Sequence, residues 1–113
     1  MSAITTHILD VSRGRPAAGV NVILEVQRGE GFAELGRGQT DDDGRLKTLL
    51  LAGERPEPGV YRLRFETGAY FEARDQAHFY PFVELAFTVT APEEHHHVPL
   101  LLSPFGFSTY RGS

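Results

Sequence analysis

The chain has 113 residues, a net charge of −4 and no cysteine, which fits one domain spanning residues 1–113. A core of this size folds without disulfides but is too small to enclose a deep active site by itself. The composition excludes a thiolate metal site and a cysteine nucleophile, and the 11 scattered basic residues argue against nucleic acid as a partner.

The N-terminal part predicts a strand and no targeting segment. Residues 1–7 lack the charged start and the apolar stretch of a secretory leader, and no apolar run approaches the roughly 20 residues that span a bilayer. We therefore expect a cytoplasmic protein with no membrane association. Residues Ile4–Asp10 are rich in β-branched side chains and end at a turn cluster, Ser12–Pro16, so they are expected to form the first strand, which contains His7.

The next segments predict a hairpin. Residues Val20–Gln27 alternate between apolar and polar side chains, as in a half-buried strand. Arg28–Gly31 is expected to connect this strand to Phe32–Gly38, which should return antiparallel to it. The inward face of the strand at Val20–Gln27 is expected to hold Val20, Val22, Leu24 and Val26.

The segment Thr40–Arg45 contains three aspartates followed by a glycine. Asp-Gly readily takes the positive φ values that tight turns require, so we expect a turn here. The aspartates lack the alternating spacing and the distant glutamate of a calcium loop, which argues against a metal site. Residues Leu46–Leu51 then predict a short strand, followed by a proline-containing loop over residues 52–59.

The second half of the chain continues the β pattern with one interruption. Residues 68–79 break the period of two and are expected to form the one helix, of two or three turns, which ends before Tyr80-Pro81. With about eight short strands in all, the sequence predicts an all-β antiparallel β-sandwich. Pro99 is expected to make its strand an edge strand or to mark a bulge. The later strands are expected at Val60–Glu66, Phe82–Thr90, His95–Ser103 and after Pro104–Gly106.

His7 and His97 are the first candidates for chemistry, because an imidazole exchanges protons near neutral pH and both lie on predicted strands. His95 shares a strand face with His97. The three histidines at 95–97, with His7, could alternatively form a zinc or copper site, although no carboxylate has an obvious ligand spacing to them. Taken alone, each histidine could also have an ordinary structural role.

A second group of candidates lies near the Asp-Gly turn and in the last four residues. Arg45 follows the turn, and its guanidinium could hold a carbonyl or a carboxylate. Residues 110–113 follow directly on a strand apolar enough to be buried, which argues for a placed tail, whereas composition alone slightly favours the disordered end that is usual for termini. Taken singly, Tyr110 and Arg111 could equally be ordinary exposed side chains.

As a set, these motifs resemble the 5-hydroxyisourate hydrolases, the transthyretin-related enzyme family, over nearly the whole chain. The closing tetrapeptide separates these hydrolases from transthyretin, the hormone carrier of the same fold. One departure is His96, where the family pattern has an aromatic residue such as tyrosine; its side chain should point away from that of His97. The motifs are Thr6–Asp10, Ser12–Ala17, Thr40–Arg45, Phe79–Phe82, His97–Pro104 and Tyr110–Ser113.

The resemblance implies a transthyretin-like sandwich of two four-stranded sheets, assembled as a homotetramer (a dimer of dimers) with substrate clefts between subunits. It implies hydrolysis of the ring amide of 5-hydroxyisourate in urate breakdown, which gives 2-oxo-4-hydroxy-4-carboxy-5-ureidoimidazoline. No metal or organic cofactor is implied. The implied catalytic residues are His7, Arg45, His97 and Ser113, and the implied substrate-binding residues are His7, Arg45, Tyr110 and Arg111.

In this centre, one of the two histidines is expected to remove a proton from water while the other orients the water or protonates the leaving nitrogen. Arg45 would stabilise the oxyanion, and Ser113 would position water or substrate, with Gly112 letting the terminus bend. Removal or bulky extension of the last four residues should abolish turnover and leave the β circular-dichroism spectrum intact. A non-catalytic small-molecule carrier and a protein-binding sandwich are the alternatives.

Overall fold

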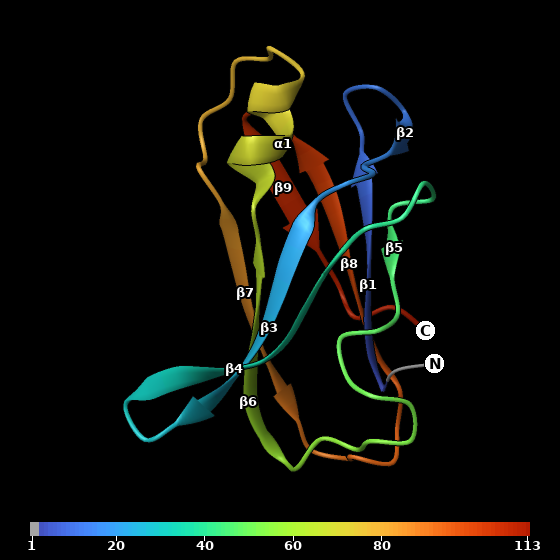
Figure 1. The fold of residues 1–113 in the computed structure, drawn as a ribbon, viewed down its shortest axis with the longest axis vertical. Coiled ribbons are helices and arrows are strands. Elements are labelled where there is room, and N and C mark those ends of the chain that lie inside the picture. The colour runs from blue at the N-terminus through green and yellow to red at the C-terminus, as the bar shows by residue number, and fades with distance from the viewer. Residues whose placement is uncertain (1–2) are drawn as a thin grey trace.

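Two β-sheets packed face to face form the protein (Figure 1), which confirms the predicted sandwich. The computed structural model describes residues 3–113. One sheet has the strand order β2-β1-β8-β9, with β5 also paired to β1, and the other has the order β4-β3-β6-β7. The elements are β1 Ile4–Asp10, β2 Arg15–Pro16, β3 Asn21–Arg28, β4 Gly31–Gln39, β5 Arg45–Leu46, β6 Gly59–Phe65, α1 Thr67–Ala73, β7 Val83–Val89, β8 His96–Ser103 and β9 Gly106–Thr109.

Alternation along the strands builds the core between the two sheets. Val22, Leu24 and Val26 of β3 are buried as expected, and Ile23 between them is half-buried on the other face. Each fully buried side chain of this size stabilises the fold by about 1.5–3 kcal/mol. The facing positions of β1, β6 and β8 complete the core with Ile4, Ile8, Tyr61, Leu63, Phe65, Val98, Leu100 and Leu102.

The pairing of β1 with β8 is parallel, whereas every other strand pair found in residues 3–113 is antiparallel. This pair joins segments about ninety positions apart, because Ile4 is paired with His96 and Asp10 with Leu102. In Figure 1 the two strands lie side by side in the middle of their sheet. The parallel register brings His7 close to the strand that carries His97.

The prediction that Pro99 marks an edge strand is wrong, because β8 lies between β1 and β9. The proline is tolerated at this position because the ladder to the C-terminal segment is interrupted there. The pairing of β8 with β9 runs from Ser103 back to Leu100, which is paired with Thr109 at the end of β9. The C-terminal segment pairs with β8 again only at His97, through Gly112. The missing N–H of Pro99 falls in this gap.

The helix is shorter than the predicted range of residues 68–79, because it ends at Ala73. Asp75 adopts a φ of 52°, and the N–H groups of Asp75 and Gln76 donate to the carbonyls of Glu72 and Phe71 at 3.0 Å each. These two bonds form a Schellman motif, which caps the last carbonyls of the helix and turns the chain away. Within residues 3–113, no helix has the length and apolarity needed to cross a membrane.

The strand predicted at Leu46–Leu51 is also wrong beyond its first residue. β5 contains only Arg45 and Leu46, and residues 47–51 leave the sheet. Leu49 and Leu50 are nevertheless buried, so their apolar pattern reflects packing without strand pairing. The segment runs so close to β4 that a Cβ on Gly36 would lie 2.0 Å from the carbonyl oxygen of Leu49.

Candidate active site

The outer face of the sheet that contains β1 and β8 brings two of the candidate histidines together. Ile4, Thr6 and Ile8 of β1 point into the core and are buried, so Thr5 and His7 point outward. In the register with β8, Thr5 is paired with His97 and His7 with Pro99. Paired residues point to the same face of a sheet, so His7 and His97 both lie on the outer face.

The Asp-Gly turn has the predicted conformation and presents Arg45 beside His7. Asp41 Oδ1 accepts the N–H groups of Asp43 and Arg45, each at 2.9 Å, and Gly44 has a φ of 76°. Chiefly through the N–H of Arg45, these bonds lower the pKa of Asp41. The turn joins strands of different sheets, since β4 pairs with β3 and β5 pairs with β1.

Arg45 is paired with His7 in the β1–β5 ladder. Its side chain is exposed, and its guanidinium takes part in none of the ion pairs found among residues 3–113. An arginine without an acidic partner keeps its planar set of donors available for the oxygen atoms of a ligand.

The tautomer of His7 follows from its hydrogen bond. Nε2 of His7 lies 2.9 Å from the carbonyl oxygen of Asp43. A carbonyl can only accept, so Nε2 must carry the proton and donate it. When the ring is neutral, Nδ1 is therefore the nitrogen that His7 offers to a substrate or to water.

His97 is half-buried and lies in a positively charged setting. Burial lowers the pKa of His97 below its usual value of 6.5, and the nearby positive charges of His95, His7 and Arg45 lower it further. Its ring is thus neutral at neutral pH. A neutral imidazole next to a guanidinium can take a proton from water.

The last residues approach His97 closely. The N–H of Gly112 donates to the carbonyl of His97 at 2.8 Å. A Cβ at position 112 would lie 2.6 Å from Cδ2 of His97, so glycine is required there by the close approach. Ser113 follows directly and is exposed. The structure therefore brings His7, Arg45 and His97 together and sets Gly112 against His97.

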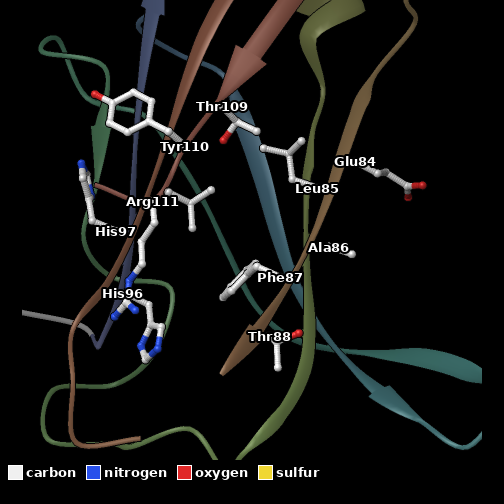
Figure 2. A pocket seen from close by; sticks show the side chains of 11 residues that line it. Glu84, Leu85, Ala86, Phe87, Thr88, His96, His97, Thr109, Tyr110 and Arg111 are labelled. Atoms are coloured by element: carbon white, nitrogen blue, oxygen red, sulfur yellow. The ribbon is translucent and has the colours of Figure 1, made fainter. Parts of the chain in front are cut away.

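The side chain of Arg111 lies in a groove beside His96 and β7 (Figure 2). This groove of about 400 Å³ runs between β7 and the ends of β8 and β9 (Figure 2). In this view the Arg111 side chain extends toward His96, and the His97 ring points away from His96, as the sequence predicted. The guanidinium of Arg111 donates to a carboxylate oxygen of Glu94 at 3.1 Å. Tyr110, which also lines the groove, is 58% exposed.

His96 is the buried member of the three consecutive histidines. It is 4% exposed, and its Nδ1 has no hydrogen-bond partner. Burial first, and then the charge of Arg111, lower the pKa of His96. In the part of the chain that the structure describes, no three His, Asp or Glu side chains lie close enough to hold a metal ion.

Thr5 is a site residue that the sequence pattern did not single out. Its hydroxyl oxygen lies 2.8 Å from Nδ1 of His97. Thr5 stands two positions before His7 and therefore on the same strand face, which is a signal that the sequence does contain. The contact with His97 depends on the parallel register of β1 and β8, which the sequence pattern does not specify.

Comparisons with known proteins give one consistent result. The Transthyretin family model, described as the HIUase/Transthyretin family, matches residues 4–112. The 5-hydroxyisourate hydrolase of Caulobacter vibrioides is 46% identical over 117 residues, which cover 100% of both chains. The structure of the Klebsiella pneumoniae 5-hydroxyisourate hydrolase has a TM-score of 0.87 at 39% identity and covers 100% of both chains. The sea bream transthyretin in complex with thyroxine has a TM-score of 0.88 at 31% identity, over 97% of this chain and 94% of that one.

Proposed function

Because the chain belongs to the HIUase/transthyretin family, we propose that it is a 5-hydroxyisourate hydrolase with its reaction centre at His7, Arg45 and His97. It hydrolyses the ring amide of 5-hydroxyisourate to 2-oxo-4-hydroxy-4-carboxy-5-ureidoimidazoline, a step of urate breakdown. The observation that supports this site best is that two imidazoles and one guanidinium converge on one sheet face, and that the guanidinium is in none of the ion pairs among the described residues. A carrier has no need of that combination.

The two histidines divide the proton transfers of the hydrolysis. One of them removes a proton from the attacking water, and the other orients the water or protonates the leaving nitrogen. His97 offers Nε2, because its Nδ1 contacts Thr5, and His7 offers Nδ1, because its Nε2 donates to Asp43. A positioned acid or base of this kind contributes a factor of about 10² to 10⁴ in rate.

Arg45 binds the oxygen-rich ring and stabilises the negative charge that develops on the carbonyl oxygen under attack. The loss of one such preorganised donor costs about 3 kcal/mol of transition-state stabilisation. Ser113 positions water or substrate, and Gly112 allows that residue to approach His97. Tyr110 and Arg111 complete the proposed substrate-binding set, with Arg111 anchoring the C-terminal segment through Glu94.

The working form is a homotetramer, a dimer of dimers, with active sites at the subunit interfaces. Two observations support this assembly: the reaction centre lies on an open sheet face, and β7 and β9 are edge strands of their sheets. We further propose that residues 1–113 form one domain, because one apolar core lies between the two sheets. The cytoplasm stays the expected compartment, and cell fractionation with an antibody tests it.

The first experiment generates 5-hydroxyisourate in the cuvette from urate with a urate oxidase and follows its ultraviolet decay. The wild type should accelerate the decay strongly, and His97→Ala and Arg45→Ala should each lower kcat/KM by about 100-fold or more. Arg37→Ala is the matched control, because Arg37 is an exposed arginine on the other sheet. Its activity should equal that of the wild type.

Decay no faster than the spontaneous background, with folded wild-type protein, would overturn the hydrolase proposal. It would favour a small-molecule carrier, which the likeness to sea bream transthyretin in complex with thyroxine keeps as the second candidate. Titration with a fluorescent hydrophobic ligand would then measure binding directly.

A further inference from the structure

A buried hydroxyl joins two imidazoles beside the reaction centre. Thr5 Oγ1 lies 2.8 Å from Nδ1 of His97 and 2.9 Å from Nε2 of His95. Thr5 is 3% exposed, whereas His95 is exposed to solvent. The two imidazole rings are stacked with their centroids 6.2 Å apart. These contacts form a continuous path from His97 through Thr5 to a solvated side chain.

Proton counting allows only two arrangements of this path. A hydroxyl has one proton, so Thr5 donates to one of the two ring nitrogens and accepts from the other. When it accepts from Nδ1–H of His97 and donates to His95, Nε2 of His97 is unprotonated and can act as a base. When it donates to His97 and accepts from Nε2–H of His95, His97 carries its proton on Nε2 and can act as an acid. Passage between the two moves one proton from His97 to His95.

The charges around His97 make this passage favourable once His97 has gained a proton. The side chains that lower its affinity for a proton are His95, His7 on β1 and Arg45 on β5. The positive charge that His97 gains with this proton is opposed by His7 and Arg45, whereas the same charge on the exposed ring of His95 is stabilised by water. The hydroxyl of Thr5 is within hydrogen-bond distance of both rings and so connects them.

We propose that Thr5 and His95 are positioning residues of the hydrolase, which hold His97 in its basic tautomer and then carry away the proton that it receives. Nε2 of His97 takes a proton from water as the water oxygen bonds to the amide carbon, and the π electron pair of the carbonyl moves onto its oxygen, where Arg45 stabilises the charge. The Nδ1–H bond of His97 breaks toward Thr5 Oγ1, and the Thr5 proton passes to Nε2 of His95. His97 ends neutral, with its proton on Nε2, and His95 holds the positive charge. This inference rests on the proposed function.

Four variants separate the relay from a structural role. Thr5→Val replaces the hydroxyl by a methyl group at nearly constant volume, and Thr5→Ser keeps the hydroxyl. Thr6→Val is the matched control, because Thr6 is also buried but donates its hydroxyl to the carbonyl of Val98 at 2.6 Å on the other face of β1. His95→Gln keeps a polar side chain that cannot accept the relayed proton.

The kinetic test measures kcat and KM of each variant between about pH 5 and pH 9. Thr5→Val should lower kcat at least about tenfold with little change in KM, and Thr5→Ser should stay within about threefold of the wild type. Thr6→Val should keep the wild-type kcat, even if it is less stable than Thr5→Val. His95→Gln should lower kcat. It should also move the acid limb of the pH profile of kcat to higher pH, because loss of a neighbouring cation raises the pKa of His97.

A second measurement is independent of turnover. Nitrogen-15 NMR of the imidazole rings reports which nitrogen of His97 carries the proton, and Thr5→Val should change this tautomer distribution while Thr6→Val should not. If the wild type proves inactive and the tautomer still changes, the hydrolase proposal fails and the hydrogen-bonded path stands. If Thr5→Val keeps wild-type kcat or leaves the tautomer of His97 unchanged, the relay is overturned.

Discussion

His96 is one of two residues in the described part of the chain, with Thr67, that have a buried side-chain polar atom without a hydrogen-bond partner. Its ring is buried beside the groove, and Nδ1 has no hydrogen-bond partner. A buried polar atom left without a partner costs about 1–3 kcal/mol. The backbone at this position is fixed by β8, so the cost belongs to the side chain and can be removed by substitution.

We expect His96→Phe to raise the free energy of unfolding by about 1 kcal/mol at neutral pH or above, because it removes the unsatisfied nitrogen and the groove leaves room for the larger ring. Urea titration followed by circular dichroism measures the change. His78→Phe is the control, since His78 Nδ1 already contacts the carbonyl of Gln76. A destabilised His96→Phe protein would contradict the prediction.

The pH dependence of stability gives a second prediction from His96 and His97. Folding lowers both pKa values below 6.5, so in that lower pH range the unfolded chain binds more protons than the folded one. Stability is therefore full above pH 6.5 and falls as the pH drops toward the folded pKa values. His96→Phe should reduce this slope by up to about 1.4 kcal/mol per pH unit. Equal slopes in the two proteins would show that His96 does not contribute.

Gly112 gives a prediction for the reaction centre. In Gly112→Ala the new Cβ would meet the ring of His97 at 2.6 Å, so we expect the segment or the ring to shift and kcat to fall by about 10-fold or more. The unfolding free energy should change little, because the segment is exposed. Gly106→Ala is the control, since its Cβ would have only an ordinary contact at 3.8 Å. Equal activities would contradict the close approach.

Among the elements, the turn of residues 41–45 has the closest link to the site. It docks on β1 through the N–H of Ile8, which donates to the carbonyl of Gly44 at 2.8 Å, and through His7, which donates to the carbonyl of Asp43. The same turn starts β5 and so presents Arg45. Its conformation therefore sets the position of the guanidinium and the tautomer of His7 together.

Gly44→Ala should disrupt this docking for two reasons. Gly44 has a φ of 76°, and a Cβ there would lie 2.4 Å from the carbonyl oxygen of Ile8. We expect a loss of more than about 1 kcal/mol in stability and a fall in kcat/KM. Gly53→Ala is the matched control, because Gly53 has a φ of 81° but open space around it, so it tests backbone strain alone. Similar losses in both would show that the contact with Ile8 does not matter.

The sequence predicted most of the strands closely. The bounds of β1 were predicted as observed, and β3, β4, β6, β7 and β8 were predicted to within one residue. Alternation with a period of two is visible in most of these strands, whereas β4, which has no buried residue, followed from the hairpin connection before it. The predicted strand at Leu46–Leu51 was wrong because buried leucines in an irregular segment have the same local pattern as a buried strand. The short strand β2, which pairs with β1, was not predicted, because Arg15 and Pro16 fall in the segment predicted as a turn.

The pairing of strands could not be predicted in the same way. Alternation defines the face of each residue but not its partner, so the parallel register of β1 with β8 and the contact of Thr5 with His97 were not foreseen. The resemblance to the family named His7, Arg45 and His97, and the structure brings these three together. Their roles, like those of Tyr110, Arg111 and Ser113, stay predictions until the variants are measured.

For the whole molecule, the edges of the sheets suggest how copies of the chain associate. β7 and β9 end their sheets on the same side of the sandwich, and the groove lies between them. Exposed strand edges offer unpaired backbone groups to another chain. We predict an assembly of four chains of 12.5 kDa, about 50 kDa in all.

Light scattering coupled to size-exclusion chromatography measures this mass directly. Because the proposed sites lie at subunit interfaces, dilution below the dissociation constant should lower specific activity as the mass falls. A proline on β9 at a residue whose N–H faces away from β8, as in Phe107→Pro, should weaken the assembly by blocking edge pairing, because Phe107 lies between the hydrogen-bonded pairs of the β8–β9 ladder. A monomer of 12.5 kDa with full specific activity would contradict the proposed interface site.

The parallel pairing of β1 and β8 also determines when during synthesis the reaction centre can exist. Thr5 and His97 touch although 92 positions separate them. A nascent chain emerges in order from its N-terminus, so β1 can pair with β2 and β5 but lacks its central neighbour until β8 has left the ribosome. If the proposed roles hold, fragments that stop before that point should have no activity, and turnover in a cell should report only chains whose synthesis has passed His97.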